Sequence, residues 1–222
     1  MNLKEFNNLI DLFFYQAEKQ NPQEIFLEWL NTVNKKKFTW SETVANIYKL
    51  SKILKNYVKK GDRVLLLSEN RPEWLIADLS IMLANAITVP AYTTYTEEDY
   101  NYLIEDCEPS VVIVSNNAMH KKLEKTINEK NFIKKIITFD IVTGANYGEK
   151  YLDFVNITKN NLSEEDKIKN TNLKRISPAC IIYTSGTGGN PKGVILSHGG
   201  ILNNIEGANE ILKPLIDKRR VF

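Results

Sequence analysis

The residues with the clearest potential for chemistry gather in one short stretch, residues 184 to 193, which reads TSGTGGNPKG. It contains the hydroxyl side chains of Thr184, Ser185 and Thr187 and one cation, Lys192. Glycines let the backbone approach a ligand closely, and a run of them can turn several N–H groups into one concavity that binds an anion. Many donors and one positive charge at a single place suit the oxygens of a polyphosphate. The stretch therefore predicts a polyphosphate-binding loop.

Two common phosphate-binding loops do not fit this stretch. The NTPase loop GxxxxGK[ST] needs a glycine before the lysine and a hydroxyl after it, whereas Pro191 precedes Lys192 and Gly193 follows it. The dinucleotide pattern GxGxxG fails because no third glycine follows Gly186 and Gly188 at the required spacing. The apolar run after the loop, GVILSH, has the length of a strand. We therefore expect the loop to join strand to strand, and a P-loop ATPase is disfavoured.

Composition places the chain among ordinary globular proteins. Hydrophobic residues make up 43% and charged residues 25% of its 222 residues, near the average for soluble domains. The formal net charge is +2, whereas a nucleic-acid partner would call for a clear basic excess. Cys107 and Cys180 form no CxxC pair, so neither a metal site nor a disulfide framework is predicted, and both are expected to be packing residues. A reducing, cytoplasmic location fits this cysteine usage.

The most apolar window, residues 74 to 92, raises the question of a membrane span. It contains Asp78 and Asn85, and a carboxylate at the centre of a span costs about 2.5–3.5 kcal/mol on insertion scales. We interpret the window as a buried helix followed by a buried strand. The N-terminal residues, which include Lys4 and Glu5, do not have the pattern of a secretory signal.

The second part of the chain predicts an α/β fold. Apolar runs of strand length alternate with helical patterns, and strands are expected near residues 63–68, 87–91, 111–115, 135–139 and 178–183. Strands joined by helices through short connections are typical of parallel βαβ units. Because these strands are apolar throughout, both faces of the sheet should be covered. The expected fold is a mostly parallel sheet flanked by helices.

The first part of the chain predicts a helix over residues 3–19, a hairpin formed by IFLEWL and KKFTW, and a second helix. Thr39 and Glu42 have the spacing of a capping box for that second helix, which should run to about Val58. We assign residues 1–58 to an incomplete second subdomain that packs less completely. Residues 59–222 form the α/β subdomain that carries the loop. Within it, residues 143–175 should form a surface loop and a short helix before the chain returns to the same sheet.

Five side chains outside the loop invite a functional interpretation, but structural roles are favoured. Ser197 and His198 are neighbours on an expected strand and would point to opposite faces, without the GxSxG pattern of a nucleophile. A structural or loop-ordering role is expected for His198. His120 lies in a lysine-rich helical segment and is expected to be exposed. Tyr92 and Tyr95 follow an expected strand, near the end where open sheets bind ligands, yet packing is their favoured role.

The run YTSGTGGNPKGV, residues 183–194, resembles the signature YTSGTTGxPKGV of the adenylate-forming (AMP-binding) ligase superfamily. The segments SENRPEW, VPAY and YLIEDCEPSVVIVS further resemble the N-terminal portion of long-chain fatty acyl-CoA synthetases. The resemblance covers the chain from about residue 4 onward. One departure is Gly188, where the family commonly has Thr, so that this chain lacks one hydroxyl donor.

The resemblance implies an αβαβα-layered enzyme domain of which this chain is the incomplete N-terminal part. It implies a long-chain-fatty-acid–CoA ligase that uses ATP, Mg²⁺ and coenzyme A to convert a carboxylate into acyl-AMP and then acyl-CoA. The implied partner is the remaining C-terminal part of a parent chain, and a peripheral membrane contact of a cytoplasmic protein is left open. The implied phosphate-binding residues, with Lys192 also catalytic, are Thr184, Ser185, Gly186, Thr187, Gly188, Gly189, Lys192 and Gly193.

Two alternatives remain open at this level. The parent could belong to another branch of the superfamily, such as an aryl or short-chain acid ligase or a peptide-synthetase adenylation domain. The chain could also be a non-catalytic nucleotide-binding fragment, because the adenine-binding segment and the C-terminal catalytic lysine of the family are expected beyond residue 222.

We predict that the 222-residue chain by itself does not make acyl-CoA. The loop would hold the phosphates, but the groups that hold the adenine and complete the reaction would be missing. A thioester-formation assay with purified chain, ATP, fatty acid and coenzyme A tests this, and robust product formation would contradict it.

Overall fold

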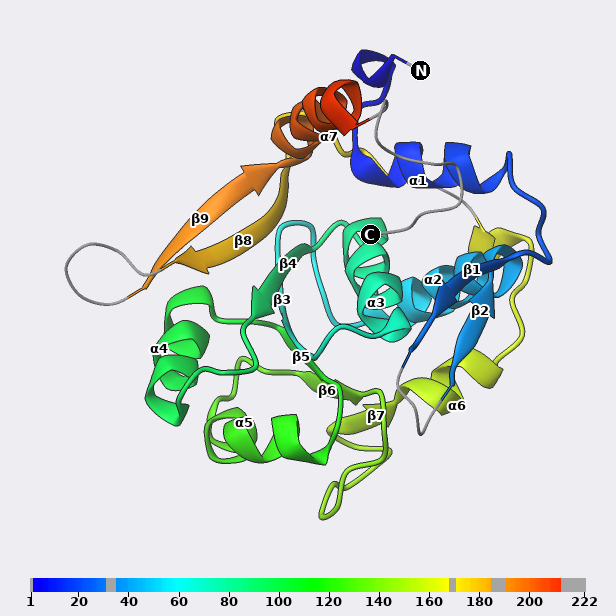
Figure 1. Ribbon diagram of the computed structural model, residues 1–222. Helices are drawn as coiled ribbons and strands as arrows, with labels where there is room; N and C mark the ends of the chain where they lie inside the picture. Colours follow the sequence, from blue (N-terminus) through cyan, green and yellow to red (C-terminus); the bar gives the residue numbers. More distant parts are fainter. Residues whose placement is uncertain (1, 31–34, 168–170, 185–190, 213–222) are drawn as a thin grey trace.

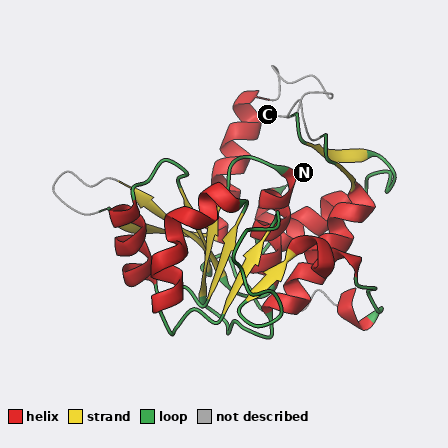
Figure 2. Cartoon of the chain, turned by 90° about the horizontal axis from the view of Figure 1, so that it is seen from below, coloured by secondary structure: helices red, strands yellow, loops and turns green. Residues whose placement is uncertain are grey.

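A seven-stranded sheet forms the centre of the computed structural model, which describes residues 2–30, 35–167, 171–184 and 191–212. The strands lie in the order β7-β6-β5-β3-β4-β8-β9, with helices on both sides of the sheet (Figures 1 and 2). Every neighbouring pair is parallel except β8 and β9. The predicted α/β class with a mostly parallel, helix-flanked sheet is confirmed.

The predicted strands occur close to their expected positions. They are β3 (Arg63–Leu67), β4 (Ile87–Ala91), β5 (Val111–Val114), β6 (Lys135–Thr138) and β8 (Pro178–Thr184). The apolar run after the loop forms β9 (Lys192–Ser197), so the loop does join strand to strand. The second large sheet that an αβαβα arrangement needs is not among the residues that the structure describes, which contain only this sheet and the two-stranded hairpin.

Successive residues of the central strands face two separate hydrophobic clusters, because side chains alternate across a strand. Val64 and Leu66 of β3 pack toward one side, whereas Leu65 and Leu67 pack toward the other, and all four are fully buried. The helices that cover the first side are α1 (Leu9–Ala17), α2 (Trp40–Leu54) and α3 (Pro72–Leu83), and those on the second side are α4 (Glu97–Cys107) and α5 (Asn117–Glu129). None of the described helices is long and apolar enough to span a membrane.

Local signals position several helix starts as expected. Thr39 accepts the backbone N–H of Glu42 at 3.2 Å, and the Glu42 carboxylate accepts the backbone N–H of Thr39 at 2.8 Å, which confirms the capping box of α2. Thr96 and Asp99 form the same reciprocal pair at the start of α4. The predicted hairpin is also present, as β1 (Ile25–Glu28) and β2 (Lys37–Thr39).

The single helix predicted over residues 3–19 is wrong. A short 3₁₀ turn (Leu3–Glu5) and α1 replace it, and Asn8 separates the two. Asn8 has an extended backbone, and its side chain accepts the N–H of Asp11 at 2.9 Å while donating to the carbonyl of Leu173 at 3.1 Å. Because the Asn8 side chain both accepts and donates a hydrogen bond, it caps the start of a new helix. The spacing of hydrophobic residues alone does not reveal this helix start.

Helices α1 and α2, which lie within the predicted N-terminal subdomain, pack into the same core as the sheet. Ile10 of α1 and Ile47, Leu50 and Leu54 of α2 are fully buried in one cluster with α3 and β3. The expectation of looser packing is therefore wrong for these helices, because they supply the cover for one face of the sheet. The division of the chain at residues 58 and 59 remains a prediction.

The segment from 143 to 175 contains more regular structure than expected. Besides the short helix α6 (Phe154–Lys159) it supplies β7 (Tyr151–Asp153), which extends the sheet in parallel beside β6. The sequence did not predict β7, because a three-residue strand is too short to form a recognisable apolar run. His120 was predicted to be exposed, and this too is wrong, since it is 1% exposed and contacts the Tyr151 hydroxyl at 2.9 Å.

The base of the β8–β9 hairpin is held by the N-terminal segment. His198 begins helix α7 (His198–Leu212). Its ring is 1% exposed, and its Nδ1 accepts the backbone N–H of Leu9 at 3.3 Å. Arg175 donates to the carbonyls of Leu3 at 3.1 Å and Phe6 at 2.8 Å. These contacts, which connect positions far apart in the sequence, give His198 the structural role expected of it.

We predict that replacing His198 with Asn flattens the dependence of stability on pH. Asn keeps an acceptor for the Leu9 N–H but does not titrate. Burial lowers the pKa of His198 from 6.5 to about 4. Between these pH values the unfolded chain binds a proton that the folded chain does not, so the free energy of unfolding falls as the pH drops through this window. The fall should be roughly 2–3 kcal/mol larger for the wild type than for His198→Asn.

Denaturant titrations of both proteins from pH 7.5 to pH 4 measure this difference. Other titrating groups contribute equally to the two proteins and cancel in the comparison. Parallel stability curves would show that His198 does not titrate in a buried environment.

Candidate functional site

The β8–β9 arm fixes the positions of Thr184 and Lys192, which lie near the two ends of the predicted phosphate loop. The strands pair antiparallel, with Thr184 opposite Lys192 and Tyr183 opposite Gly193. In Figure 1 the arm extends away from the body of the sheet. Thr184 and Lys192 are both exposed there, and no described residue forms an ion pair with Lys192. A hydroxyl and a free cation therefore face each other across the end of the arm.

The structure describes three of the predicted loop residues, Thr184, Lys192 and Gly193. The others lie outside the described residues, and their roles stay predictions: Ser185, Gly186, Thr187, Gly188 and Gly189. Within the described residues, no cluster of His, Cys, Asp and Glu side chains has the makings of a metal site.

Gly193 is required for packing within the arm. A Cβ at this position would lie 2.9 Å from Cγ2 of Ile181 and 3.2 Å from Cζ of Tyr183. The first distance is shorter than real contacts allow, so the backbone of β9 rests directly on the side chains of β8. The sequence assigned Gly193 to phosphate binding, which stays a prediction, and packing is a separate reason for glycine here.

A cavity of about 390 Å³ lies beside the arm at the carboxyl ends of β3 and β4. Its lining comes from the turn after β3, from α3, from the end of β4 and from β8: Ser68, Glu69, Asn70, Trp74, Pro90, Ala91, Tyr92, Thr93 and Ile182. Tyr92 is 58% exposed and lines this cavity, so it is not a core residue, but its ring packs edge-on against Tyr95 in the turn after β4. Tyr95 does pack, edge-on against Tyr92 and Tyr100, and its hydroxyl donates to the Tyr183 carbonyl at 3.3 Å.

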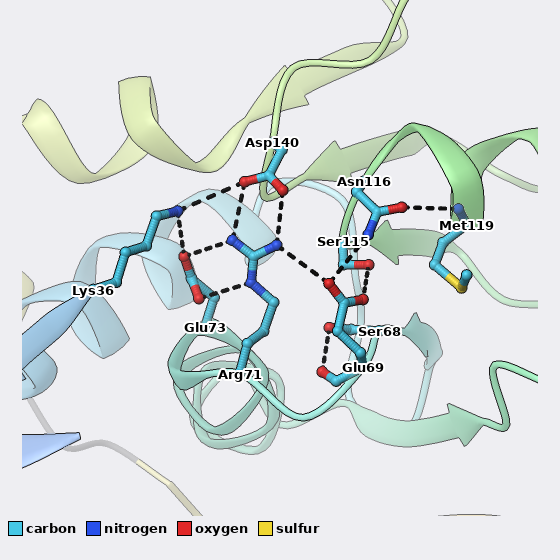
Figure 3. A network of polar contacts seen from close by, with 9 residues as sticks. All are labelled: Lys36, Ser68, Glu69, Arg71, Glu73, Ser115, Asn116, Met119 and Asp140. Carbon is cyan, nitrogen blue, oxygen red and sulfur yellow. Dashed lines mark hydrogen bonds and ion pairs between the residues drawn. The ribbon is translucent and has the colours of Figure 1, made fainter. Parts of the chain in front are cut away.

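Sequence reasoning missed a polar network at the same edge of the sheet (Figure 3). Arg71, whose side chain is fully buried, donates two hydrogen bonds of 2.9 Å to Glu73 and two of 2.9 Å to Asp140. Lys36, from the hairpin, contacts Glu73 at 2.8 Å and Asp140 at 3.6 Å. The network joins the hairpin, the start of α3 and the end of β6. The one available signal was the pair of opposite charges around Pro72 at the helix start.

Glu69 extends this network across the centre of the sheet. Its carboxylate lies 3.6 Å from the Arg71 guanidinium, and it accepts hydrogen bonds from Ser115 and, at 3.1 Å, from Asn116. Glu69 follows β3, and Ser115 and Asn116 follow the neighbouring β5. The helices after these two strands, α3 and α5, lie on opposite faces of the sheet. Neighbouring strands of this kind form the switch point at which open α/β sheets place ligands.

The opposite charges of the buried network stabilise one another, so its members stay ionised. Burial alone would raise the pKa of Glu73, but hydrogen bonds from Arg71 and Lys36 and the positive charge of Arg71 outweigh it and lower the pKa below its usual value. The pKa of Asp140 is lowered in the same way, against the effect of burial, by Arg71 and Lys36. Burial opposes the charge of Arg71, yet its carboxylate partners raise its pKa above the ordinary value.

We predict that Arg71→Met destabilises the protein by about 3–5 kcal/mol, the cost of breaking a buried ion pair by removing one partner. Met keeps much of the aliphatic stem, but Glu73, whose side chain is 1% exposed, is left with Lys36 as its charged partner. The matched control is Lys37→Met, which breaks the exposed Lys37–Glu28 pair and should cost less than about 1 kcal/mol. Urea unfolding of both variants measures the contrast, and equal small losses would rule out a stabilising role for the network.

Comparison with known proteins supports the resemblance seen in the loop motif. A family model described as AMP-binding enzyme matches residues 13–220. Fatty acyl-CoA synthetase A of Dictyostelium discoideum is 32% identical over 159 residues, which cover 68% of this chain and 23% of that protein. A long-chain-fatty-acid–CoA ligase of Bacillus subtilis is 31% identical over 189 residues, which cover 77% of this chain and 34% of that protein. The chain thus spans about a quarter to a third of the length of these curated relatives.

The fold is shared with solved structures at lower identity. The structure of ATP-bound MatB from Rhodopseudomonas palustris matches with a TM-score of 0.71 and 22% identity, over 94% of this chain and 38% of that chain. The match of the family model to nearly the whole sequence, together with the loop motif carried on the β8–β9 arm, shows that the chain belongs to the AMP-binding enzyme family.

Proposed function

We propose that this chain is the N-terminal part of an enzyme that activates a long-chain fatty acid with ATP and transfers the acyl group to coenzyme A. The observation that carries the proposal is the end of the β8–β9 arm, where the exposed Lys192 lies opposite Thr184 at the two ends of a glycine- and hydroxyl-rich loop. A fixed cation with hydroxyl and backbone donors suits the β- and γ-phosphates of a nucleotide.

The reaction would proceed in two steps. A carboxylate oxygen attacks the α-phosphorus of ATP, the bond from that phosphorus to the bridging oxygen breaks, and pyrophosphate leaves. The thiol of coenzyme A then attacks the acyl carbon, loses its proton, and displaces AMP. The contribution of this chain would be to the first step, in which negative charge grows on the departing pyrophosphate and a preorganised cation stabilises the transition state.

Magnesium fits this site as a companion of the phosphates. The donors at the end of the arm are a lysine ammonium and a threonine hydroxyl, which match phosphate oxygens and do not form a carboxylate cage for a metal. Mg²⁺ commonly binds through substrate phosphates with few protein ligands. When bound it would neutralise phosphate charge, while Lys192 and Thr184 orient the chain of phosphates.

The long-chain substrate is supported by the kind of relative found. The two relatives described above are named as a fatty acyl-CoA synthetase and a long-chain-fatty-acid–CoA ligase, and the SENRPEW segment resembles that branch. The competing proposals are an aryl or short-chain acid ligase or an adenylation domain of a peptide synthetase, which would share the phosphate loop and differ in the acyl site. A non-catalytic nucleotide-binding fragment is the alternative from a different class.

The proposed partner of the chain is the C-terminal part of the same enzyme, since the relatives extend well beyond the matched region. We further propose that residues 1–58 belong to a subdomain completed by that part, that the enzyme is cytoplasmic, and that it contacts a membrane peripherally to collect its lipid substrate. Expression of the longer protein followed by fractionation of cytosol and membranes tests the location.

We predict that Lys192→Ala in the complete enzyme slows acyl-adenylate formation by about tenfold or more, because a charge-assisted contact to the departing pyrophosphate is lost. Lys192→Arg should restore part of the rate, since the planar guanidinium keeps the charge and changes its shape. Thioester formation from supplied acyl-adenylate should be largely unaffected, because pyrophosphate has already left.

ATP–pyrophosphate exchange and the second half-reaction, measured side by side, test this prediction. Lys121→Ala, which removes an exposed lysine on α5, serves as the control and should leave both rates unchanged. Unchanged exchange in Lys192→Ala, or equal damage to both half-reactions, would exclude the phosphate role of Lys192.

A further inference from the structure

The hydroxyl of Tyr183 donates a hydrogen bond to the carboxylate of Asp106 at the end of α4. We infer that this bond positions the phosphate site: Asp106 and Tyr183 act as positioning residues that hold the tip of the β8–β9 arm, and with it Thr184 and Lys192, against the body of the sheet. The inference rests on the proposed function of the arm and assigns roles to two residues outside the phosphate-binding set.

In the described part of the arm, backbone pairing with the rest of the sheet is short. β3 and β4 pair along five positions, from Arg63 opposite Ile87 to Leu67 opposite Ala91, whereas β4 and β8 pair at Thr88 opposite Cys180 alone. In Figure 1 the β8–β9 arm extends away from the body of the sheet. The contacts of His198 and Arg175 hold the base of the arm, so a hydrogen bond beyond Cys180 restrains the part of the arm that carries Thr184.

Tyr183 provides such a restraint. It lies three positions beyond Cys180, its side chain is 3% exposed, and it is the last residue before Thr184. Its hydroxyl bonds to Asp106, and its carbonyl accepts a hydrogen bond from Tyr95 at 3.3 Å. Burial, followed by the bond to Asp106, raises the pKa of Tyr183 above its ordinary value, so the phenol remains a donor at physiological pH. The side chain and the backbone at this position are thus tied to one neighbourhood around α4.

The same ring also sets the position of the opposite strand. Gly193 lies across from Tyr183, and the place where its Cβ would stand is 3.2 Å from Cζ of that ring. Lys192 precedes Gly193, and Thr184 follows Tyr183. One anchored side chain therefore fixes the two residues that flank the loop, relative to each other and to α4. Displacement of the arm by an ångström would move both donors away from a nucleotide held elsewhere, and such a displacement is costly for affinity.

A plain packing role for Tyr183 makes a different prediction. If only the ring matters, Phe serves equally well, and Asp106, which is exposed, contributes nothing. If the hydroxyl positions the arm, Tyr183→Phe and Asp106→Ala should each weaken phosphate binding while the fold stays intact. The double variant should be no worse than either single variant, because both remove the same bond. Asp106→Asn keeps an acceptor oxygen and should fall between the wild type and Asp106→Ala.

The test uses the 222-residue chain and magnesium pyrophosphate as the probe, with affinity measured by isothermal titration calorimetry and folding followed by circular dichroism and thermal melting. We expect Tyr183→Phe and Asp106→Ala to lower the affinity about five- to tenfold, the effect of losing a hydrogen bond to a charged group in a positioning element. The matched control is Tyr151→Phe, which removes another buried tyrosine hydroxyl, bonded to His120 at the far edge of the sheet. It should lower the melting temperature and leave the affinity unchanged.

The outcomes separate the inference from the proposed function. If Lys192→Ala weakens binding but Tyr183→Phe and Asp106→Ala bind as the wild type does, the phosphate site stands and the positioning role is wrong. If Tyr183→Phe does not fold, Asp106→Ala and Asp106→Asn, at an exposed position, decide the matter alone. If the wild type does not bind pyrophosphate, or Lys192→Ala binds it equally well, the proposed function of the arm fails and the inference fails with it.

Discussion

The burial of the central strands on both faces is the constraint on which the rest of the structure depends. In β3 and β5 every side chain from Val64 to Leu67 and from Val111 to Val114 is fully buried, so a polar group has no place along their length. The first polar side chains occur just past the carboxyl ends, as Ser68 and Glu69 after β3 and Ser115 and Asn116 after β5. Because the strands are parallel, these ends meet at one edge of the sheet. The polar network and the cavity beside β4 both occur at that edge for this reason.

Charges that lie at this edge must be compensated by one another. Arg71 is buried together with Glu73, and a lone charge in that position would be strongly unfavourable. The four hydrogen bonds of the guanidinium and the contact from Lys36 supply the compensation. The result is a rigid connection between the hairpin and the turns that follow β3 and β6.

The β8–β9 arm differs from the central strands in its burial and in its pairing. It shares one rung with β4, and its outer strand carries the exposed Val194 and Ile195. Its orientation comes from specific contacts at its two ends, His198 and Arg175 at the base and Tyr183 near the tip. The proposed phosphate-binding role suits this position, because a charge carried outside the packed sheet is not penalised by burial.

Much of the fold and the family to which the loop motif belongs could be predicted from the sequence alone. The strands of the sheet are continuous apolar runs, Thr39 and Thr96 carry their own capping partners three residues on, and the loop motif depends on residue types in a fixed order. Each of these features lies within one short segment, so it can be recognised without knowing which distant segments pack against it. The wrong predictions, a single helix over residues 3–19 and an exposed His120, depended on distant contacts. The residues near Asn8 do not show that the Leu173 carbonyl accepts its side-chain N–H, and those near His120 do not show that Tyr151 contacts its ring.

Only the tertiary structure decided which distant residues meet. Asp106 and Tyr183 are 77 positions apart, and Arg71 and Asp140 are 69 apart, so their pairing follows from strand order and helix placement. The periodicity of the sequence shows that a strand is buried but not which strand lies beside it, and the partners of polar side chains depend on that order. The family motif could thus be recognised from its residue types, whereas the contacts of Tyr183 and the charged network at the sheet edge arise from the packing of elements that are far apart in the sequence.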